Sequence, residues 1–210
     1  ATVKAEAGKG HDLLFVGAEP VSGRERGFSA EIESIVTAFG GSAVIVSARG
    51  RLRRNPEAAL RILVPVNGDA LSTRATELAC ILAQAKGARV AAYYSPEERA
   101  GRGSPRVRGA AAERAVFANV ERIAEHYGLA VTPLSGEGTA TAILTEARRG
   151  RYTLIVVGVG ARAAEGLSFG PLADALLEQA DRSLAFFMAG ETAPPPKEDE
   201  QGPGRNAPAA

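Results

Sequence analysis

The sequence predicts an α/β fold in which a doubly wound, parallel five-stranded sheet carries helices on both faces. Short apolar runs alternate with helical patterns along residues 61–190, and this alternation is typical of parallel strands joined by right-handed crossovers. The apolar runs are continuous, as in Leu154–Val157, which indicates strands that are covered on both sides. A further strand–helix–strand pattern in residues 1–50 adds a half-copy of the same unit.

Each element of the complete unit has its own local signal. Strands are expected at the apolar runs 61–66, 90–94, 129–133, 154–157 and 184–187. Four helices separate them: the first capped by Ser72 or Thr73 and ended by Gly87, the second over about residues 110–127, the third opened by Thr139 or Thr141, and the last beginning near Gly170.

An internal repeat links the two ends of the chain. The run from His11 to Gly17 corresponds to the run from Tyr152 to Gly158, an offset of 141 residues. At the same offset Phe28 falls on Phe169, and Ser42–Val46 falls on Ser183–Phe187. The pattern predicts that residues 1–50 repeat the second half of the complete unit.

The repeat divides the chain into four parts. We expect a half-unit in residues 1–50, a basic linker in 51–60, a complete unit in 61–190 and a disordered tail in 191–210. A bare strand–helix–strand unit cannot bury both of its faces. We therefore expect the copies to associate through their terminal strands, Ser42–Val46 and Ser183–Phe187, and to form a dimer-like pair. The start at Ala1 instead of Met favours a piece of a longer protein.

Composition excludes several classes of function. The 25 Lys and Arg residues against 24 Asp and Glu residues leave a formal charge of +1, so we expect no nucleic-acid partner. One Cys and two His residues cannot form a disulfide or a His/Cys metal cluster, which favours a reducing, cytoplasmic setting. No apolar run approaches the roughly 18 residues that span a bilayer.

A candidate anion site follows the two central strands. In an open parallel sheet, ligands bind beyond the carboxyl ends of the strands, where the strand order reverses. Glycines and a helix N-terminus at that point can bring backbone N–H groups to a phosphate. The residues expected there are Pro65, Val66, Asn67 and Gly68 after the first strand, with Gly158, Gly160, Gly170 and Pro171 after the fourth.

On these residues the chain resembles the universal stress protein family. The resemblance covers residues 61–189, and the half-unit matches the second half of a tandem copy. It implies an adenine nucleotide alpha hydrolase-like sandwich, and in members that bind ATP it implies a Gly-x2-Gly-x9-Gly-Ser/Thr loop with an Asp in the first turn. It also implies that such tandem modules form cytoplasmic C-terminal regions of cation/proton antiporters and amino-acid transporters.

The sequence departs from the ATP-binding pattern at three positions. One residue instead of two separates Gly158 from Gly160, Pro171 stands in place of Ser or Thr, and Asn67 stands in place of Asp. Pro171 has no N–H to offer a phosphate but suits the first position of a helix. Two interpretations remain: a site for ATP or AMP, and glycines whose role is structural.

The function that we expect is regulatory and non-catalytic. No nucleophile, base and orienting acid stand in a recognisable set, and Cys80 has no His partner in sequence. The preferred hypothesis is a stress-response module that belongs to a membrane transporter. The alternatives are a universal stress protein that signals by ATP or AMP occupancy, and a nucleotide-dependent α/β enzyme.

Overall fold

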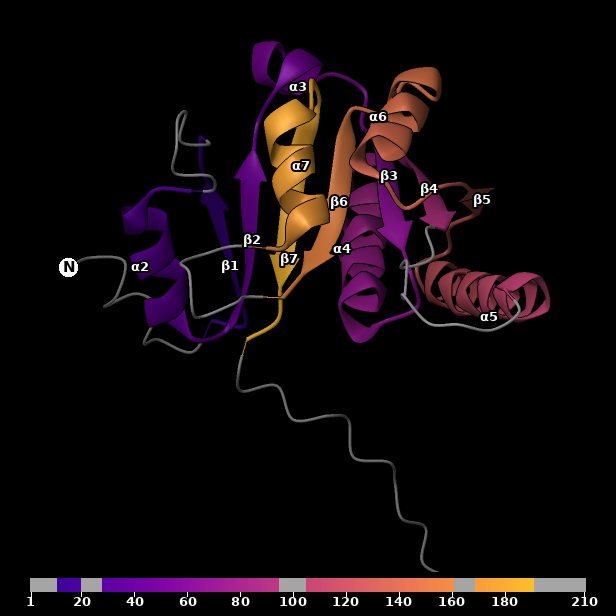
Figure 1. The fold of residues 1–210 in the computed structure, drawn as a ribbon. Coiled ribbons are helices and arrows are strands. Elements are labelled where there is room, and N and C mark those ends of the chain that lie inside the picture. Colours follow the sequence, from indigo (N-terminus) through magenta and orange to yellow (C-terminus); the bar gives the residue numbers. More distant parts are fainter. Residues whose placement is uncertain (1–10, 20–27, 95–104, 161–168, 191–210) are drawn as a thin grey trace, which may run out of the picture.

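The computed structural model describes residues 11–19, 28–94, 105–160 and 169–190. They form one seven-stranded sheet with helices on both faces (Figure 1). The elements are β1 (Leu13–Gly17), α2 (Ala30–Phe39), β2 (Ser42–Ser47), α3 (Gly50–Arg54), β3 (Arg61–Val66), α4 (Ala70–Lys86), β4 (Arg89–Tyr94), α5 (Pro105–His126), β5 (Val131–Ser135), α6 (Ala140–Arg149), β6 (Leu154–Val159), α7 (Pro171–Gln179) and β7 (Ser183–Met188).

The strand order is β1-β2-β7-β6-β3-β4-β5. The prediction of a doubly wound sheet is confirmed, and β3 and β6 lie side by side at the point where the order reverses. The sheet is larger than the five strands expected for the complete unit, because β1 and β2 extend it at the β7 edge. Every pairing is parallel except that of β2 with β7, which is antiparallel.

Two apolar layers lie on either side of this sheet. On one face lie α2, α6 and α7. Ile143 of α6 and Leu176 of α7 are buried there in one cluster with Phe186 of β7. On the other face, α4 and α5 pack over β3, β4 and β6, where Val64 and Val156 are fully buried. Most of the apolar strand residues are buried, which is why the strands lack an alternating pattern.

Several local signals act as expected, and others differ. Gly87 ends α4 in the left-handed conformation, and Thr139 caps α6 by accepting a hydrogen bond from the Ala142 N–H. The cap of α4 is Asp69 instead of Ser72 or Thr73, because its carboxylate reaches the Ser72 N–H at 2.6 Å. The second helix begins earlier, at Pro105, a residue suited to the first turn.

The half-unit repeats the pairing register of the complete unit. Leu13 lies opposite Ser42 in the β1–β2 pair, and the residues 141 positions later, Leu154 and Ser183, lie opposite each other in the β6–β7 pair. In the antiparallel β2–β7 pair, Ile45 lies opposite Phe186, which is its own counterpart in the repeat. The pairing is therefore symmetric about this point, and both side chains are fully buried.

An aromatic cluster lies against the same contact. The Phe28 and Phe169 rings, which are counterparts in the repeat, have centroids 5.7 Å apart. Both rings also contact Phe186, at 6.0 Å and 5.3 Å. Large aromatic contacts of this kind contribute packing energy beyond their buried area, so the half-unit is attached to the complete unit by a true core.

Arg49, between β2 and α3, joins the two units. Its guanidinium donates hydrogen bonds to the carbonyl oxygens of Leu177, at 2.6 Å, and Ala180, at 2.7 Å. Its backbone N–H donates to the Ser183 Oγ at 3.0 Å, and burial lowers the pKa of the guanidinium. The Arg49 guanidinium therefore caps the carboxyl end of α7.

The reason that α7 needs this cap is local. The helices α2, α4 and α6 are each followed by a glycine, but α7 is followed by Ala180 in an extended conformation and has no basic residue in its last turn. Free carbonyl groups and the negative end of the helix dipole favour a cation at this position. Arg49 supplies that cation from the other unit.

We expect Arg49→Ala to lower the free energy of unfolding by about 1.5–3 kcal/mol, the range for hydrogen bonds to a charged group. The matched control is Arg53→Ala, since Arg53 lies on α3 with an exposed ion pair to Glu19 and should change stability by less than about 1 kcal/mol. Urea unfolding of both variants measures the difference. Equal losses for the two variants would contradict the capping role.

Candidate functional site

The candidate site lies where β3 and β6 end. β3 leads directly into residues 67–69 and the first turn of α4, and β6 ends at Val159. Gly158 and Gly160 lie against Leu71 in that turn. The structure therefore brings the two predicted loops together. Gly170 and Pro171 begin α7, and residues 161–168, which connect them to Gly160, lie outside the described part of the chain.

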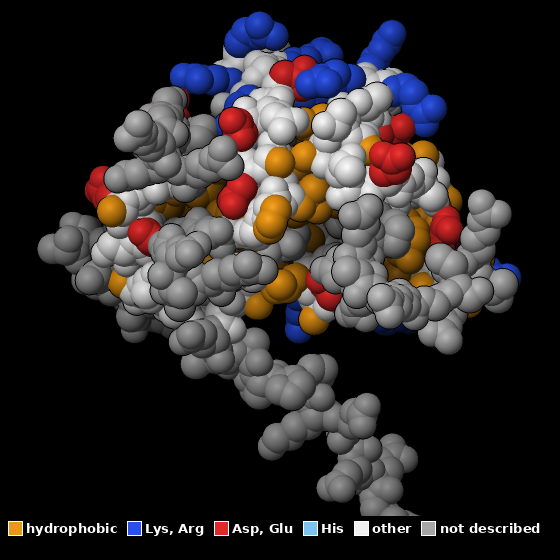
Figure 2. Space-filling model, viewed as in Figure 1, with side chains coloured by type: hydrophobic (Ala, Val, Ile, Leu, Met, Phe, Trp, Pro, Cys, Tyr) orange, Lys and Arg blue, Asp and Glu red, His pale blue; other side chains and the backbone are white. Residues whose placement is uncertain are grey.

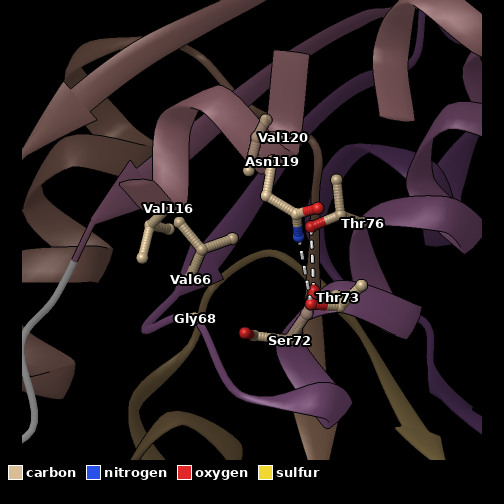
Figure 3. A pocket seen from close by; sticks show the side chains of 8 residues that line it. All are labelled: Val66, Gly68, Ser72, Thr73, Thr76, Val116, Asn119 and Val120. Atoms are coloured by element: carbon tan, nitrogen blue, oxygen red, sulfur yellow. Dashed lines mark hydrogen bonds between the residues drawn. The ribbon is translucent and has the colours of Figure 1, made fainter. Parts of the chain in front are cut away.

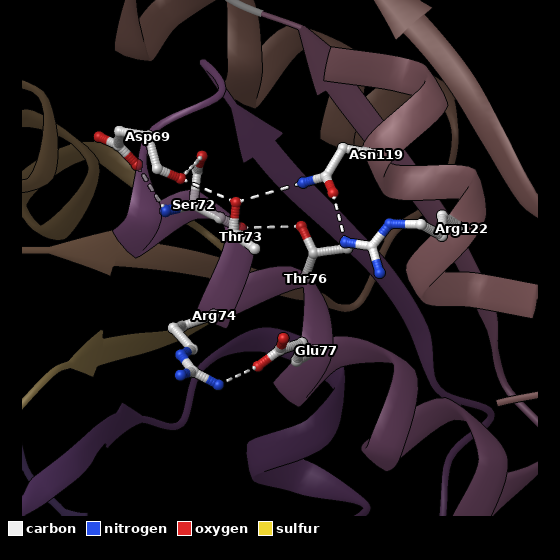
Figure 4. Close-up of polar contacts among 8 residues, drawn as sticks. All are labelled: Asp69, Ser72, Thr73, Arg74, Thr76, Glu77, Asn119 and Arg122. Atoms are coloured by element: carbon white, nitrogen blue, oxygen red, sulfur yellow. Dashed lines mark hydrogen bonds and ion pairs between the residues drawn. The ribbon is translucent and has the colours of Figure 1, made fainter. Parts of the chain in front are cut away.

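The turn after β3 is closed by its own side chains, and Figure 4 shows the bond between Asp69 and Ser72. The Asp69 N–H donates to the Asn67 Oδ1, and the Asn67 Nδ2 donates to the Asp69 Oδ2, both at 3.0 Å. The other Asp69 oxygen accepts the Ser72 N–H. Gly68 permits this turn with φ +89°, and a Cβ there would lie 2.7 Å from the Val116 side chain.

This arrangement changes the electrostatics of the site. A helix N-terminus attracts anions because its first N–H groups lack partners. At α4 the Asp69 carboxylate accepts the Ser72 N–H, so this donor is already bonded within the chain. Sequence reasoning singled out Asn67 and missed Asp69, although an Asp three residues before Ser72 is a standard N-cap signal.

Gly158 is required by packing. A Cβ at this position would lie 2.3 Å from the Leu71 carbonyl oxygen and 2.9 Å from the Ser72 nitrogen. The end of β6 therefore approaches the backbone of α4 too closely for any side chain. Gly160 is different, because its nearest neighbour would be the Leu71 Cδ1 at 3.6 Å, an ordinary contact. One of the two glycines thus has a structural explanation that needs no ligand.

The start of α7 offers few donors. Gly170 is the N-cap with φ +89°, and as a glycine it has no side chain that could cap this turn. Pro171 occupies the first helical position, where it has no N–H, and Asp174 adds a carboxylate to the first turn. These features suit a structural helix start better than a phosphate cradle.

The remaining predicted residues are buried. Pro65 and Val66 lie at the end of β3, and Val66 is 2% exposed. Val66 lines a small pocket between β3, α4 and α5 (Figure 3). Its other lining residues are Gly68, Ser72, Thr73, Thr76, Val116, Asn119 and Val120.

The polar groups of this pocket bond to one another. The Thr76 Oγ1 donates to the Ser72 carbonyl oxygen at 2.8 Å, and the Asn119 Nδ2 donates to the Thr73 Oγ1 at 3.4 Å. Arg122 in turn donates to the Asn119 Oδ1 at 2.8 Å. The pocket was not anticipated from the sequence, and its hydrogen bond between Asn119 and Thr73 joins α5 to α4.

Other reactive side chains are inert or solvated. Cys80 is fully buried between α4 and α5, and burial together with the nearby Glu77 raises the pKa of its thiol to about 11. His126 packs edge-on against the Tyr127 ring. In the described ranges no three His, Cys, Asp or Glu side chains are grouped to hold a metal ion, and no helix there is long and apolar enough to cross a bilayer.

Basic side chains gather near the amino ends of β3 and β6, away from the candidate site. Figure 2 shows Lys and Arg side chains concentrated over α3 and α6. This basic face comprises exposed Arg51, Arg53, Arg54, Arg148, Arg149 and Arg151. β1 runs in the direction opposite to β6, so the carboxyl end of β1 lies on the side of the basic face. Glu19, which follows β1, forms an ion pair with Arg53 at 2.9 Å.

Comparison with known proteins places the fold in context. A search of curated proteins finds none that matches this chain. Among solved structures, a universal stress protein from Archaeoglobus fulgidus matches with a TM-score of 0.51 and 18% identity, covering 65% of this chain and 99% of that one.

Longer structures match more of the chain. A second Archaeoglobus fulgidus universal stress protein has a TM-score of 0.58 and 14% identity, covering 88% of this chain and 64% of that one. A putative universal stress protein from Pseudomonas aeruginosa has a TM-score of 0.54 and 14% identity, covering 89% of this chain and 66% of that one. Coverage this high is more than residues 59–210 could supply, so these matches include the half-unit.

A family profile matches the sequence directly. The profile is that of the Universal stress protein family, and it aligns with residues 59–186, which are more than half of the chain and contain β3 to β6 with most of β7. Together with the sheet order and the crossovers, this match identifies the chain as a member of the universal stress protein family.

Proposed function

We propose that the chain is a non-catalytic regulatory module of the universal stress protein type, which acts through contacts with partners and does so without nucleotide. The observation that carries the proposal is the Asp69 carboxylate, which bonds to the Ser72 N–H and the Asn67 amide, so that donors of the turn after β3 are already engaged within the chain. The loss of an N–H at Pro171 and the packing role of Gly158 support it.

The proposal includes a tandem arrangement of two copies within one chain. It is supported by the shared offset of 141 residues in both parallel pairings and by the symmetric contact of Ile45 with Phe186. In this arrangement β2 covers the edge of β7, which a single copy would leave open. Association between separate chains through these strands stays a prediction, as does a cytoplasmic role in a transporter, which follows from the family resemblance alone.

The absence of catalysis is also part of the proposal. Enzymes of nucleotide-dependent α/β classes need donors for the phosphates and a group that activates a nucleophile. In the described residues the turn after β3 offers a carboxylate that is already bonded, and the one thiol has a raised pKa. Neither group is suited to that chemistry.

Nucleotide titration tests the proposal. We expect the melting temperature to stay unchanged with millimolar ATP or AMP, with and without Mg²⁺, since a ligand at 100 times its Kd would stabilise the protein by about 2.7 kcal/mol. Differential scanning fluorimetry measures this. A saturable rise in the melting temperature that Gly160→Val removes would favour signalling by nucleotide occupancy, because the structure has room for a side chain at position 160.

The role of Asp69 leads to a separate prediction. If its carboxylate serves the helix, Asp69→Ala should lower the free energy of unfolding by about 1 kcal/mol, the usual cost of losing an N-cap. Thr139→Ala, which removes the cap of α6, is the matched control and should cost a similar amount. Chemical unfolding at neutral pH compares them. A variant at position 69 that is more stable than the parent would show that Asp69 is held for another purpose.

A further inference from the structure

The two end strands of the sheet differ in how their edges are protected. At one end β5 carries Pro133 in its middle, a residue without an N–H that discourages further pairing. At the other end β1 consists of Leu13-Leu-Phe-Val-Gly17, with no proline and no charge. Its Phe15 side chain is 53% exposed. An open apolar edge of this kind is characteristic of a strand that binds another strand.

The counterpart of β1 shows what such a strand is built to receive. At the offset of 141 residues, Phe15 corresponds to Val156 in β6, which is fully buried beneath α4. Gly17 corresponds to Gly158, which lies against the Leu71 backbone, whereas no atom of the described residues lies within 4 Å of a Cβ placed on Gly17. The half-unit therefore carries the residues of a covered strand, and the described part of the chain supplies no cover for them.

The cover in the complete unit is a strand and the helix that follows it. β3 pairs with β6 in parallel, with Ile62 opposite Leu154 and Leu63 opposite Ile155. α4 then packs across both strands with a face of small residues, Ala75, Ala79 and Ala83, which are fully buried. The residues of β1 that correspond to Leu154 and Ile155 are Leu13 and Leu14.

We propose that the outer edge of β1 and the face around Phe15 form a docking surface for a strand–helix segment of the β3–α4 kind. The segment adds a short apolar strand in parallel beside Leu13 and Leu14, and its helix lies over Phe15 and Gly17. Because Phe15 is larger than Val156, the docked helix needs Gly or Ala opposite it. This inference concerns a second surface, and it holds whether or not nucleotide binds at the β3–β6 crevice.

The test supplies that segment from the chain itself. A copy of residues 59–151 is placed before Ala1 of the full chain, so that residues 1–10 connect the copy to β1. Phe15→Cys then reports whether the face is covered, since Cys80 is fully buried with a thiol pKa of about 11 and adds little background. Ile81→Cys on α4 is the matched control, because Ile81 is 48% exposed.

In the chain without the copy, we expect a thiol reagent to label the Phe15→Cys and Ile81→Cys variants at comparable rates. In the extended chain, labelling of the Phe15→Cys variant should slow at least about tenfold, while the Ile81→Cys variant should keep its rate. Adding Leu63→Asp within the copy should restore fast labelling, because the copied strand can no longer be buried.

Hydrogen exchange provides a second measurement that needs no substitution. The amides of β1 should exchange more slowly in the extended chain than in the parent. Unchanged labelling and unchanged exchange in the extended chain would overturn the proposal. Protection in the parent chain that rises with protein concentration would overturn it as well, since a second copy of the chain would then be the occupant of the edge.

Discussion

The antiparallel contact between β2 and β7 determines how the rest of the molecule is arranged. It is the one pairing in the sheet that reverses direction, and it joins a half-unit to a complete unit with Ile45 opposite Phe186 at its centre. The parallel pair of β1 and β2 runs opposite to the parallel pair of β6 and β7. The carboxyl ends of β1 and β6 therefore point to opposite sides of the molecule. The crevice at β3 and β6 is thereby separated from the basic face over α3 and α6.

At the same contact, a residue of the half-unit forms hydrogen bonds with polar groups of the complete unit. α7 belongs to the complete unit, yet its last carbonyl groups are bonded by Arg49, which follows β2. Ser183 at the start of β7 accepts a hydrogen bond from the Arg49 N–H and donates one to the Arg49 carbonyl oxygen. The junction thus combines the hydrogen bonds of Arg49 with the buried contact of Ile45 and Phe186, and both join the half-unit to the complete unit.

Much of the fold could be predicted from the sequence because the signals are local. The apolar runs, Gly87 and Thr139 act through neighbours a few residues away. The roles of Arg49 and Gly158 could not be predicted, because they depend on residues that are distant in the sequence. The Arg49 guanidinium bonds to residues more than 120 positions away, and Gly158 is explained by the backbone at Leu71. At the candidate site, Asp69 was the polar residue that mattered, and the emphasis on Asn67 obscured its capping signal.

Residues of the half-unit and of the complete unit that lie 141 positions apart have different surroundings in the structure. Gly17 and Gly158 follow equivalent strands, but only Gly158 is confined, because only β6 has α4 against it. Phe15 and Val156 differ in the same way. In the complete unit the Asp69 carboxylate caps the helix that follows β3, while no described strand pairs with the outer edge of β1 in the half-unit. In the described residues, the apolar edge at β1 is the feature that favours contact with another segment, and this difference between the two units supports the proposed role in binding partners.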